Sequence, residues 1–455
     1  MSVLERVAEY VAGLDPNSLS ADETEALGVH VLDALGAMIA GRATPDGAAL
    51  ARLAAGSDGR PGAFAEGTVD DVAVRAATAR LTEIDDIHLP SCTTPGSVVV
   101  PVALTVAARI GDIDAARFAA AVAVGYEVLT RLGRAIRGPE ILYRGVWPTY
   151  FAAPAAAATV TARLLGLSAD RTVHALALAL VATSGAAGRW GGGWSGRWLV
   201  LGQAAHAGCT AALAAADGYT GDAELLDGDW LQRTHGIEHD PDVMTEGLGA
   251  TSVVASLSIK PYCSAKQAIA AIYGLRGILS QGVAADDIRR VRVGVPPQYR
   301  AMISRGITDG DRLSSIVSAP YQLALIAYAP DGLHDVARSH LADDERIQAF
   351  MAKVEVADDD GLAAYYPERW PARVEVETAA GRWSELVLDA PGDPGRRFDA
   401  EQARAKFGIY AGPALGDEEP DEWIDLADRA IRDDGAANRL AERVDEAWAV
   451  PPPGR

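Results

Sequence analysis

The position of strand-like alternation along the chain is the feature that most limits its fold. Apolar and polar residues alternate in four segments, which are 288–295 (IRRVRVGV), 352–357, 372–378 (ARVEVET) and 383–388. The chain before about residue 255, and again from Asp399 to Trp448, repeats its apolar residues at helical spacing. We therefore expect a mainly α protein. It should have a large, discontinuous all-helical domain (residues 1–255 and 397–455) and a smaller α+β domain (residues 256–396).

Helix signals in the first region support this division. Ser20 and Glu23 have the spacing of a capping box, and Leu27, Val31 and Leu35 follow at helical spacing. Apolar residues make up 49% of the chain and aromatic residues only 6%, because alanine dominates the apolar content, and the chain also contains 46 glycines. Side chains this small favour close helix packing over a β-sandwich.

The net charge limits the possible binding partners of the protein, and the cysteine count limits the cellular compartment in which it is expected. A formal net charge of −21 argues against nucleic acid and anionic membranes, since both bind basic patches. Cys92, Cys209 and Cys263 lack metal-binding spacing, and an odd, sparse cysteine count fits a reducing cytoplasm. No signal-peptide pattern opens the chain, and the apolar runs at 151–162 and 176–187 are too short to span a membrane. We expect a soluble cytoplasmic protein.

The segment LTEIDDIHLPSCTTPG, residues 81–96, is the first candidate for chemistry. It places Asp85 and Asp86 beside His88, in a chain with only eight histidines. A metal site, an acid–base pair and an ordinary loop are all compatible with this segment. No further ligands with suitable spacing join them, so we expect no metal here. Asp86 and His88 are expected to form a hydrogen-bonded orienter and base.

Two segments offer arginines for an anion. YRGVWPTY (143–150) places Arg144 and Trp147 just before a predicted helix, where a guanidinium favours carboxylate or phosphate. Taken alone, however, this segment favours a surface turn with a buried tryptophan. GRWGGGWSGRW (188–198) matches G-x-G-x-x-G literally but lacks the strand that a dinucleotide site requires. We expect instead a loop that presents Trp190, Trp194 and Arg197 to a pocket.

The segment SIKPYCSAKQ, residues 258–267, gathers cationic and phenolic groups. Lys260, Tyr262 and Lys266 could bind an anion or act in proton transfer, and an exposed interdomain hinge is the alternative. Among the histidines, His30 falls within a helical pattern and is expected only to pack or to lie on the surface. His235 and His239 have a chelating spacing, but their glycine- and proline-containing surroundings make a helix doubtful.

Taken together, the motifs resemble the MmgE/PrpD family, which includes 2-methylcitrate dehydratase, cis-aconitate decarboxylase and iminodisuccinate epimerase. Six segments occur in family order: DDIH (85–88), RGVWPT (144–149), GRWLVLGQAAHAG (196–208), DGYTGDAELLDG (217–228), KPYCSAKQ (260–267) and SAPYQLALIAY (318–328). The resemblance implies a homodimer, with a pocket between the domains that needs neither metal nor redox cofactor. It also implies functional roles for Asp86, His88, Lys260 and Tyr321.

Three departures from the family pattern bear on the reaction. Thr94 stands where the family usually has a histidine before a proline, and Trp147 replaces the histidine of R-G-x-H-P-T. Arg197 replaces a lysine and can clamp an anion in bidentate form. These changes remove two candidate proton shuttles, so 2-methylcitrate is not the expected substrate. We place Thr94 and Trp147 in the substrate-binding set, with Lys266 nearby.

The expected function is a cofactor-independent lyase. It would eliminate water, or another leaving group such as phosphate, from a small carboxylate- or phosphate-bearing substrate through a carbanion-like intermediate. In this hypothesis Lys260 and Arg197 hold the anion with support from Arg144, and His88 or Lys260 is the base. Tyr262 or Tyr321 then delivers a proton. An isomerase or epimerase using the same carbanion is the close alternative, and a non-catalytic family member is the third.

Overall fold

A computed structural model of the protein describes residues 1–54, 71–186, 195–250, 252–308, 311–338, 343–416 and 418–449. The chain divides into two compact units. The first unit contains the N-terminal part of the chain as far as Leu257 and the C-terminal part from Phe398. The second unit contains Ser258–Arg397.

The first unit is helical throughout its described residues. Ser20 caps its longest helix and forms the predicted capping box with Glu23, and Asp399 caps the first helix of the returning segment in the same way. The α-helices are α1 (Val3–Gly13), α2 (Ala21–Arg42), α3 (Pro45–Ala54), α4 (Asp71–Leu81), α5 (Gly96–Ile110), α6 (Ala115–Ala135), α7 (Gly138–Ile141), α8 (Pro148–Leu165), α9 (Ala169–Val181), α10 (Gly196–Ala216), α11 (Trp230–His235), α17 (Ala400–Leu415), α18 (Pro420–Ala430) and α19 (Ala436–Ala449). Short 3-10 turns occur at Pro16–Ser18, Leu142–Arg144, Pro241–Met244 and Val253–Ser256.

Small residues let these helices approach closely. Helix α8 packs against α6, α9 and α10, and the shared core of α8, α9 and α10 contains buried alanines such as Ala158, Ala175 and Ala212. A Cβ on Gly208 of α10 would lie 2.1 Å from the carbonyl oxygen of Pro154 in α8, so only glycine allows this contact. The alanine- and glycine-rich composition is thus used for close helix–helix packing.

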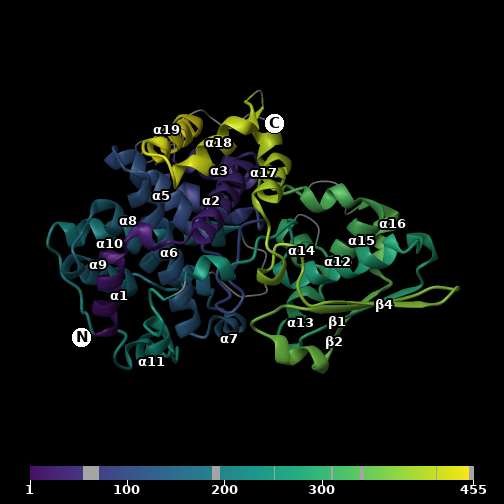
Figure 1. Ribbon diagram of the computed structural model, residues 1–455. Coiled ribbons are helices and arrows are strands. Elements are labelled where there is room, and N and C mark those ends of the chain that lie inside the picture. The colour runs from purple at the N-terminus through teal and green to yellow at the C-terminus, as the bar shows by residue number, and fades with distance from the viewer. Residues whose placement is uncertain are drawn as a thin grey trace, which may run out of the picture. The chain divides into compact units, whose positions relative to one another are not determined.

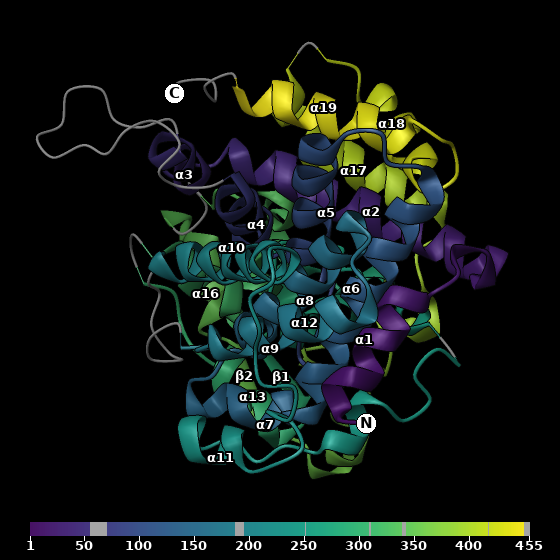
Figure 2. The ribbon, with the colours of Figure 1, turned by 90° about the vertical axis from the view of Figure 1, so that its left-hand side faces the viewer.

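The returning C-terminal segment is part of the first unit's core. Helix α17 lies beside α2 in both views (Figure 1, Figure 2), and α18 and α19 pack against each other, with α18 also against α2 and α19 against α5. Phe407 and Ala411 of α17 are buried. The first unit is therefore built from two chain segments that, in the sequence, lie on either side of the second unit.

The second unit contains a four-stranded mixed sheet. Its strands are β1 (Arg290–Val295), β2 (Val354–Asp358), β3 (Ala372–Glu377) and β4 (Arg382–Val387), in the order β2-β1-β3-β4. Strands β1 and β2 are parallel, and β1 with β3 and β3 with β4 are antiparallel (Figure 1). The helices are α12 (Lys266–Ser280), which packs on β3 and β4, and α13 (Pro297–Ile303), α14 (Arg312–Val317), α15 (Ala319–Tyr328) and α16 (Glu345–Met351). The 3-10 turns are Ala285–Asp287, Pro330–His334, Asp360–Tyr365 and Pro394–Arg396.

The mainly α fold with a smaller α+β part is confirmed, and all four predicted strands are present. Residues 314–328 have a helical pattern in the sequence that predicts one helix, but this stretch forms parts of two helices. Ser318 lies between α14 and α15, and its hydroxyl caps the second helix by accepting from the Tyr321 amide. Pro320 at the start of α15 favours a new helix there, because proline fits the first turn but not a helix interior.

Within the described residues, one helix, α10, is long and apolar enough to cross a membrane. Its most apolar window has a mean hydropathy of 1.4, and 44% of that window is buried inside the protein. Core helices of soluble proteins meet the same criterion.

Candidate active site

Residues 81–96 form a buried, ordered segment between α4 and α5. His88 and Thr93 are joined by two backbone hydrogen bonds, with N···O distances of 2.7 and 3.3 Å. Glu83 and Cys92 adopt positive φ angles of 57° and 54°, which non-glycine residues seldom do, at a cost of roughly 1–2 kcal/mol each. The segment is therefore a buried loop whose backbone must be held in place by tertiary contacts.

Three donors from three different helices hold the Asp86 carboxylate. Its Oδ2 lies 2.9 Å from His30 Nδ1 of α2 and accepts from the Tyr126 hydroxyl of α6 at 2.9 Å. Its Oδ1 accepts from the Gly96 amide at the start of α5, at 2.8 Å. The predicted hydrogen bond between Asp86 and His88 is therefore wrong, because the partner histidine is His30, 56 residues away in the chain.

Glycine is required where α5 meets this carboxylate. A Cβ on Gly96 would lie 2.9 Å from both Asp86 carboxylate oxygens and 2.9 Å from the Tyr126 hydroxyl oxygen. The absence of a side chain lets the helix N-terminus approach the anion, where backbone N–H groups favour negative charge.

His88 contacts neutral hydroxyl groups instead of a carboxylate. Its Nδ1 lies 2.8 Å from Ser91 Oγ, which lies 2.6 Å from Thr93 Oγ1. Burial, together with the nearby positive charge of Arg134, lowers the pKa of His88 from 6.5 to about 3. His88 is therefore neutral near pH 7 and, as placed here, a weak proton acceptor.

The N-terminus of α8 brings Thr94 and Trp147 into one region. The Thr94 amide donates to Thr149 Oγ1 at 3.0 Å, and the two threonine hydroxyl oxygens lie 3.2 Å apart. Trp147 is the N-cap residue of α8 and stacks on Tyr150, with their ring centres 5.9 Å apart. Two side chains assigned to substrate binding thus flank the start of one helix.

Arg197, on the first turn of α10, joins this region through its guanidinium. The guanidinium carbon lies 3.7 Å from the centre of the Trp147 ring and 4.7 Å from that of Trp198, and Nε contacts the Tyr150 hydroxyl at 3.5 Å. The side chain is 4% exposed. Its Nη2 is buried without a hydrogen-bond partner, and no carboxylate pairs with it among the described residues.

Arg80 is a second buried arginine in the same unit, and its charge is compensated. It forms ion pairs with Glu83 at 2.7 Å and with Asp85 at 3.2 Å, while its guanidinium carbon lies 5.6 Å from the centre of the Trp198 ring. Arg80 and Arg197 thus contact the same indole, but only Arg80 has acidic partners among the described residues. An anion that enters this region would find its uncompensated cation at Arg197.

Arg144 lies apart from these contacts. It is exposed and donates to the carbonyl oxygen of Gly236 at 2.7 Å, beside a surface hollow of about 560 Å³ that Arg137 and Glu238 also line. Gly236 ends α11 directly after His235, so His235 and His239 do not share one helix. Arg144 therefore stabilises the end of α11.

In the second unit, the segment 258–265 is buried, so its interpretation as an exposed hinge is wrong. The Cys263 amide donates to the Leu333 carbonyl at 3.0 Å, and the Ala265 amide donates to the Ile316 carbonyl at 3.1 Å. Lys260 at the centre of this turn is 2% exposed. A buried lysine in a rigid turn is typical of an ion pair or of a functional site.

The other predicted residues of the second unit have mixed surroundings. Lys266 forms a buried ion pair with Asp393, with an N···O distance of 2.8 Å, so its charge is already balanced. The Tyr262 hydroxyl accepts from Arg276 at 3.1 Å. Tyr321 lies in the first turn of α15, and burial raises the pKa of its hydroxyl. Tyr321 is therefore protonated near pH 7, as a proton donor must be.

A second buried ion pair, which no sequence motif indicates, lies near Asp86. Asp33, one turn along α2 from His30, pairs with Lys406 of α17, whose ammonium also donates to the Ile84 carbonyl at 2.6 Å. Burial raises the pKa of Asp33, although the Lys406 charge opposes the shift. His30, Asp33, Tyr126 and Lys406 lie far from residues 81–96 in the chain, so no local motif could indicate them.

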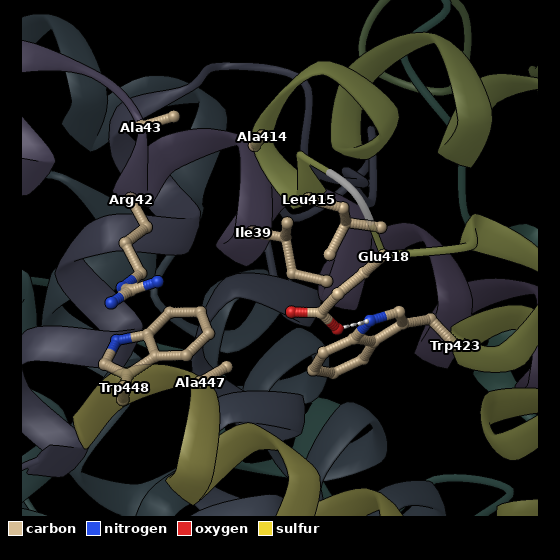
Figure 3. Close-up of a pocket in the computed structure, with 9 residues that line it drawn as sticks. All are labelled: Ile39, Arg42, Ala43, Ala414, Leu415, Glu418, Trp423, Ala447 and Trp448. Carbon is tan, nitrogen blue, oxygen red and sulfur yellow. Dashed lines mark hydrogen bonds between the residues drawn. The ribbon is translucent and has the colours of Figure 1, made fainter. Parts of the chain in front are cut away.

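A further cavity of about 370 Å³ lies in the first unit between α2, α17 and α19 (Figure 3). Glu418 accepts there from the Trp423 indole at 2.9 Å and from Arg443 at 3.1 Å, and the guanidinium carbon of Arg42 lies 5.2 Å from the Trp448 ring centre. Its lining contains no histidine, lysine or tyrosine. We do not place the active site there.

Part of the glycine-rich segment is not described. Gly191, Gly193, Trp190 and Trp194 lie outside the described residues, so the predicted loop around them stays a prediction. The described part of the chain contains no group of three or more histidine, cysteine, aspartate or glutamate side chains that could hold one metal ion.

Comparison with known proteins agrees with the motifs. Residues 5–243 match the MmgE/PrpD N-terminal domain, and residues 262–430 match the MmgE/PrpD C-terminal domain. Over 195 residues the chain is 32% identical to the cis-aconitate decarboxylase-like protein oryM of Aspergillus oryzae, a match that spans 39% of this chain and 40% of that relative. The two domain matches together cover most of the sequence in the family's order, so the chain belongs to the MmgE/PrpD family.

Proposed function

We propose that the protein is a lyase that removes a leaving group from a small carboxylate substrate through a carbanion-like intermediate. Family membership and the cis-aconitate decarboxylase-like relative support an enzyme of this general kind. In the proposed reaction, a base removes the proton on the carbon next to a substrate carboxylate. The electrons of that C–H bond then form a double bond as the leaving group departs with its own bonding pair and, as hydroxide, takes up a proton to leave as water.

The main support for the proposal is that Arg197 is buried without an acidic partner among the described residues. Burying an arginine without an acidic partner is costly, and binding an anion would remove that cost. Because Trp147 lies 3.7 Å and Trp198 4.7 Å from the guanidinium carbon, we infer that an anion reaches the guanidinium along its edge. A planar carboxylate fits such an edge through two parallel hydrogen bonds. The same cation would stabilise the charge that develops on the carboxylate when the neighbouring proton leaves.

Other residues of the first unit would shape this site. Thr94 and Thr149 offer hydroxyl groups at the start of α8, and the neutral His88 imidazole can form hydrogen bonds without adding charge. For Lys260, Tyr262 and Tyr321 in the second unit, the proposed roles as cation and proton donors rest on their positions in the family motifs. Their substitution by Met, Phe and Phe, respectively, belongs in the same activity assay.

The test is turnover of a panel of small di- and tricarboxylates, including cis-aconitate, followed by NMR in D2O. The proposal predicts an unsaturated product and a released leaving group. Deuterium incorporation without loss of a leaving group would instead show an isomerase or epimerase. Absence of both binding and turnover across the panel would support a non-catalytic family member.

The Arg197→Met variant directly tests whether Arg197 binds the substrate anion. We expect kcat/KM to fall by roughly 30-fold or more, because truncating one partner of a buried charge pair costs about 2–5 kcal/mol. The ligand-free variant should keep its stability to within about 2 kcal/mol, because only cation–π contacts and a long hydrogen bond to the Tyr150 hydroxyl are lost. Arg233→Met, an exposed change on α11, is the matched control. A large loss of stability with unchanged kcat/KM would show that Arg197 is structural.

We further propose that the protein works in the cytoplasm as a homodimer. The three cysteines are buried and none of them forms a disulfide, which suits a reducing compartment. Light scattering coupled to size-exclusion chromatography measures the oligomeric state, and a monomeric mass would contradict the dimer.

A further inference from the structure

His30 is a histidine that no sequence motif marks, and it lies beside Asp86. The residue is 5% exposed, and its Nδ1 lies 2.9 Å from Asp86 Oδ2. In the described part of the chain its Nε2 has no hydrogen-bond partner, and Nε2 is not among the fully buried atoms that lack one. One ring nitrogen is thus held by a carboxylate, while the other keeps its lone pair or proton available.

This arrangement orients an imidazole for proton transfer. Asp86 is fixed independently of the ring by the Tyr126 hydroxyl and by the Gly96 amide, so it can hold His30 in one orientation. A carboxylate bonded to Nδ1 sets the tautomer with its lone pair on Nε2 and stabilises the imidazolium that forms when Nε2 takes a proton. His88 lacks this support, because its Nδ1 faces the Ser91 hydroxyl.

We infer that the His30 imidazole, oriented by Asp86, is the acid–base group of the first unit, in the role that the motif suggested for His88. The inference rests on the proposed function. Nε2 of His30 takes the proton from the carbon next to the substrate carboxylate, and the electron pair of that C–H bond stays on the substrate. The leaving hydroxyl then takes up the proton from Nε2, which restores the neutral ring.

Charged and polar groups from several elements lie near His30. Asp86 lies on one side and Asp33 one turn along α2, while Lys406 of α17 is bonded to Asp33. From α6, the Tyr126 hydroxyl points at Asp86. Lys406 therefore pairs with Asp33, and His30 is left as a partner of Asp86.

The variant His30→Asn separates the two roles that this residue could have. The side-chain amide of asparagine reaches about as far as histidine Nδ1, so it can still donate to Asp86 but offers nothing at Nε2. We expect kcat to fall by roughly 10²–10⁴-fold, the usual contribution of a general base, with little change in KM. Tyr126→Phe should cost less, because it removes one donor to Asp86 and leaves the imidazole in place. His206→Asn, on the exposed side of α10, is the matched control and should not change kcat.

Retained turnover in His30→Asn is the outcome that would overturn the inference. If His30→Asn keeps kcat within a few-fold while His88→Asn loses it, His30 only holds Asp86 in place and His88 is the base. Melting temperatures of all variants show whether any loss reflects unfolding.

A measurement without substrate keeps this inference separate from the proposed function. Long-range ¹H–¹⁵N NMR of histidine-labelled protein reports which ring nitrogen carries the proton, and the His30 signal is assigned by its absence in His30→Asn. We expect a proton on Nδ1 and a lone pair on Nε2, with Nε2 protonated when the sample is acidified. A proton on Nε2 with bare Nδ1, or a ring that never protonates, would refute the inference whether or not a substrate is found. If NMR shows the expected ring but no substrate in the panel turns over, the proposed function fails and the assignment of the ring stands.

Discussion

The effect of removing Lys406 from its buried ion pair with Asp33 can be predicted quantitatively. Water cannot reach the buried Asp33 carboxylate to replace the lost cation, so only a few responses are open to it. In Lys406→Met, Asp33 keeps its position on α2 but loses its cation, and its Oδ2 already lacks a hydrogen-bond partner within the described residues. A buried carboxylate in this state can either stay charged, which is very costly, or take up a proton. The cheaper of the two is protonation.

The cost of protonation depends on pH and can be worked out. Keeping an aspartate neutral when its unfolded-state pKa is about 3.9 costs about 1.4 kcal/mol for each pH unit above that value, which gives about 4 kcal/mol at pH 7 and about 1.5 kcal/mol at pH 5. The sign follows from burial, which raises the pKa of Asp33 in the folded protein. The folded state of the variant then binds the extra proton, so its stability is highest at low pH and falls as pH rises.

Hydrogen exchange of peptides from α2 and α17 measures the local opening free energy at both pH values. In the control Asp33→Asn/Lys406→Met no charge is left unpaired, so we expect a loss of about 1–2 kcal/mol for the buried amide, independent of pH. Equal destabilisation of the single variant at both pH values, or a loss below about 1 kcal/mol at pH 7, would show that the pair is solvated and that this reasoning is wrong.

Three further changes have defined outcomes. Gly96→Ala places a methyl group 2.9 Å from both Asp86 oxygens, so we expect a loss of about 1–3 kcal/mol in unfolding experiments together with reduced turnover. Lys266→Met leaves Asp393 buried and unpaired and should destabilise the second unit by about 3–5 kcal/mol, whereas Lys266→Met/Asp393→Asn should restore most of that loss in hydrogen exchange of α12. The pKa of His88 falls from 6.5 to about 3 on folding, so on acidification the unfolded chain takes up this proton before the folded protein does. His88 therefore lowers the free energy of unfolding as the pH falls from 6.5 toward 3, by up to about 5 kcal/mol. His88→Gln should therefore move acid unfolding to lower pH, and an unchanged acid transition would contradict the lowered pKa.

The fold could be predicted from the sequence because its signals are local. Alternation at 288–295 and 372–378 marks β1 and β3, and the capping boxes at Ser20 and Asp399 mark the helix starts on either side of the second unit. Periodicity and caps involve residues within one turn or one strand of each other, so a single sequence contains them in full. The division of the 314–328 helix at Ser318 is also local, and the serine–proline signal that causes it is present in the sequence.

The candidate site could be predicted only in part, because its contacts join distant residues. The adjacent Asp85, Asp86 and His88 mark the segment 81–96 as a candidate site. The sequence cannot show, however, that Asp86 contacts His30 and Tyr126, which lie 56 and 40 residues away. The proximity of His88 in the chain suggested the wrong partner. In the folded chain His88 instead contacts Ser91, within the short bridged turn that joins His88 to Thr93.

The contrast between Arg80 and Arg197 shows what the structure adds. Both are buried, and both lie near the Trp198 ring. Sequence alone marks neither as free, since Glu83 and Asp85 could have paired with any nearby cation in an acidic chain.

The discontinuity of the first unit connects the fold to the proposed chemistry. Lys406 reaches Asp33 on α2 and the carbonyl oxygen of Ile84, two residues before Asp86. The C-terminal segment therefore holds both the helix that carries His30 and the segment that carries Asp86. A displacement of α17 would move these two partners relative to each other, and a hydrogen bond of 2.9 Å tolerates little displacement. We infer that the return of the chain to its first unit is needed to build the histidine–aspartate pair, and that a local weakening of α17 would lower turnover before it unfolds the unit.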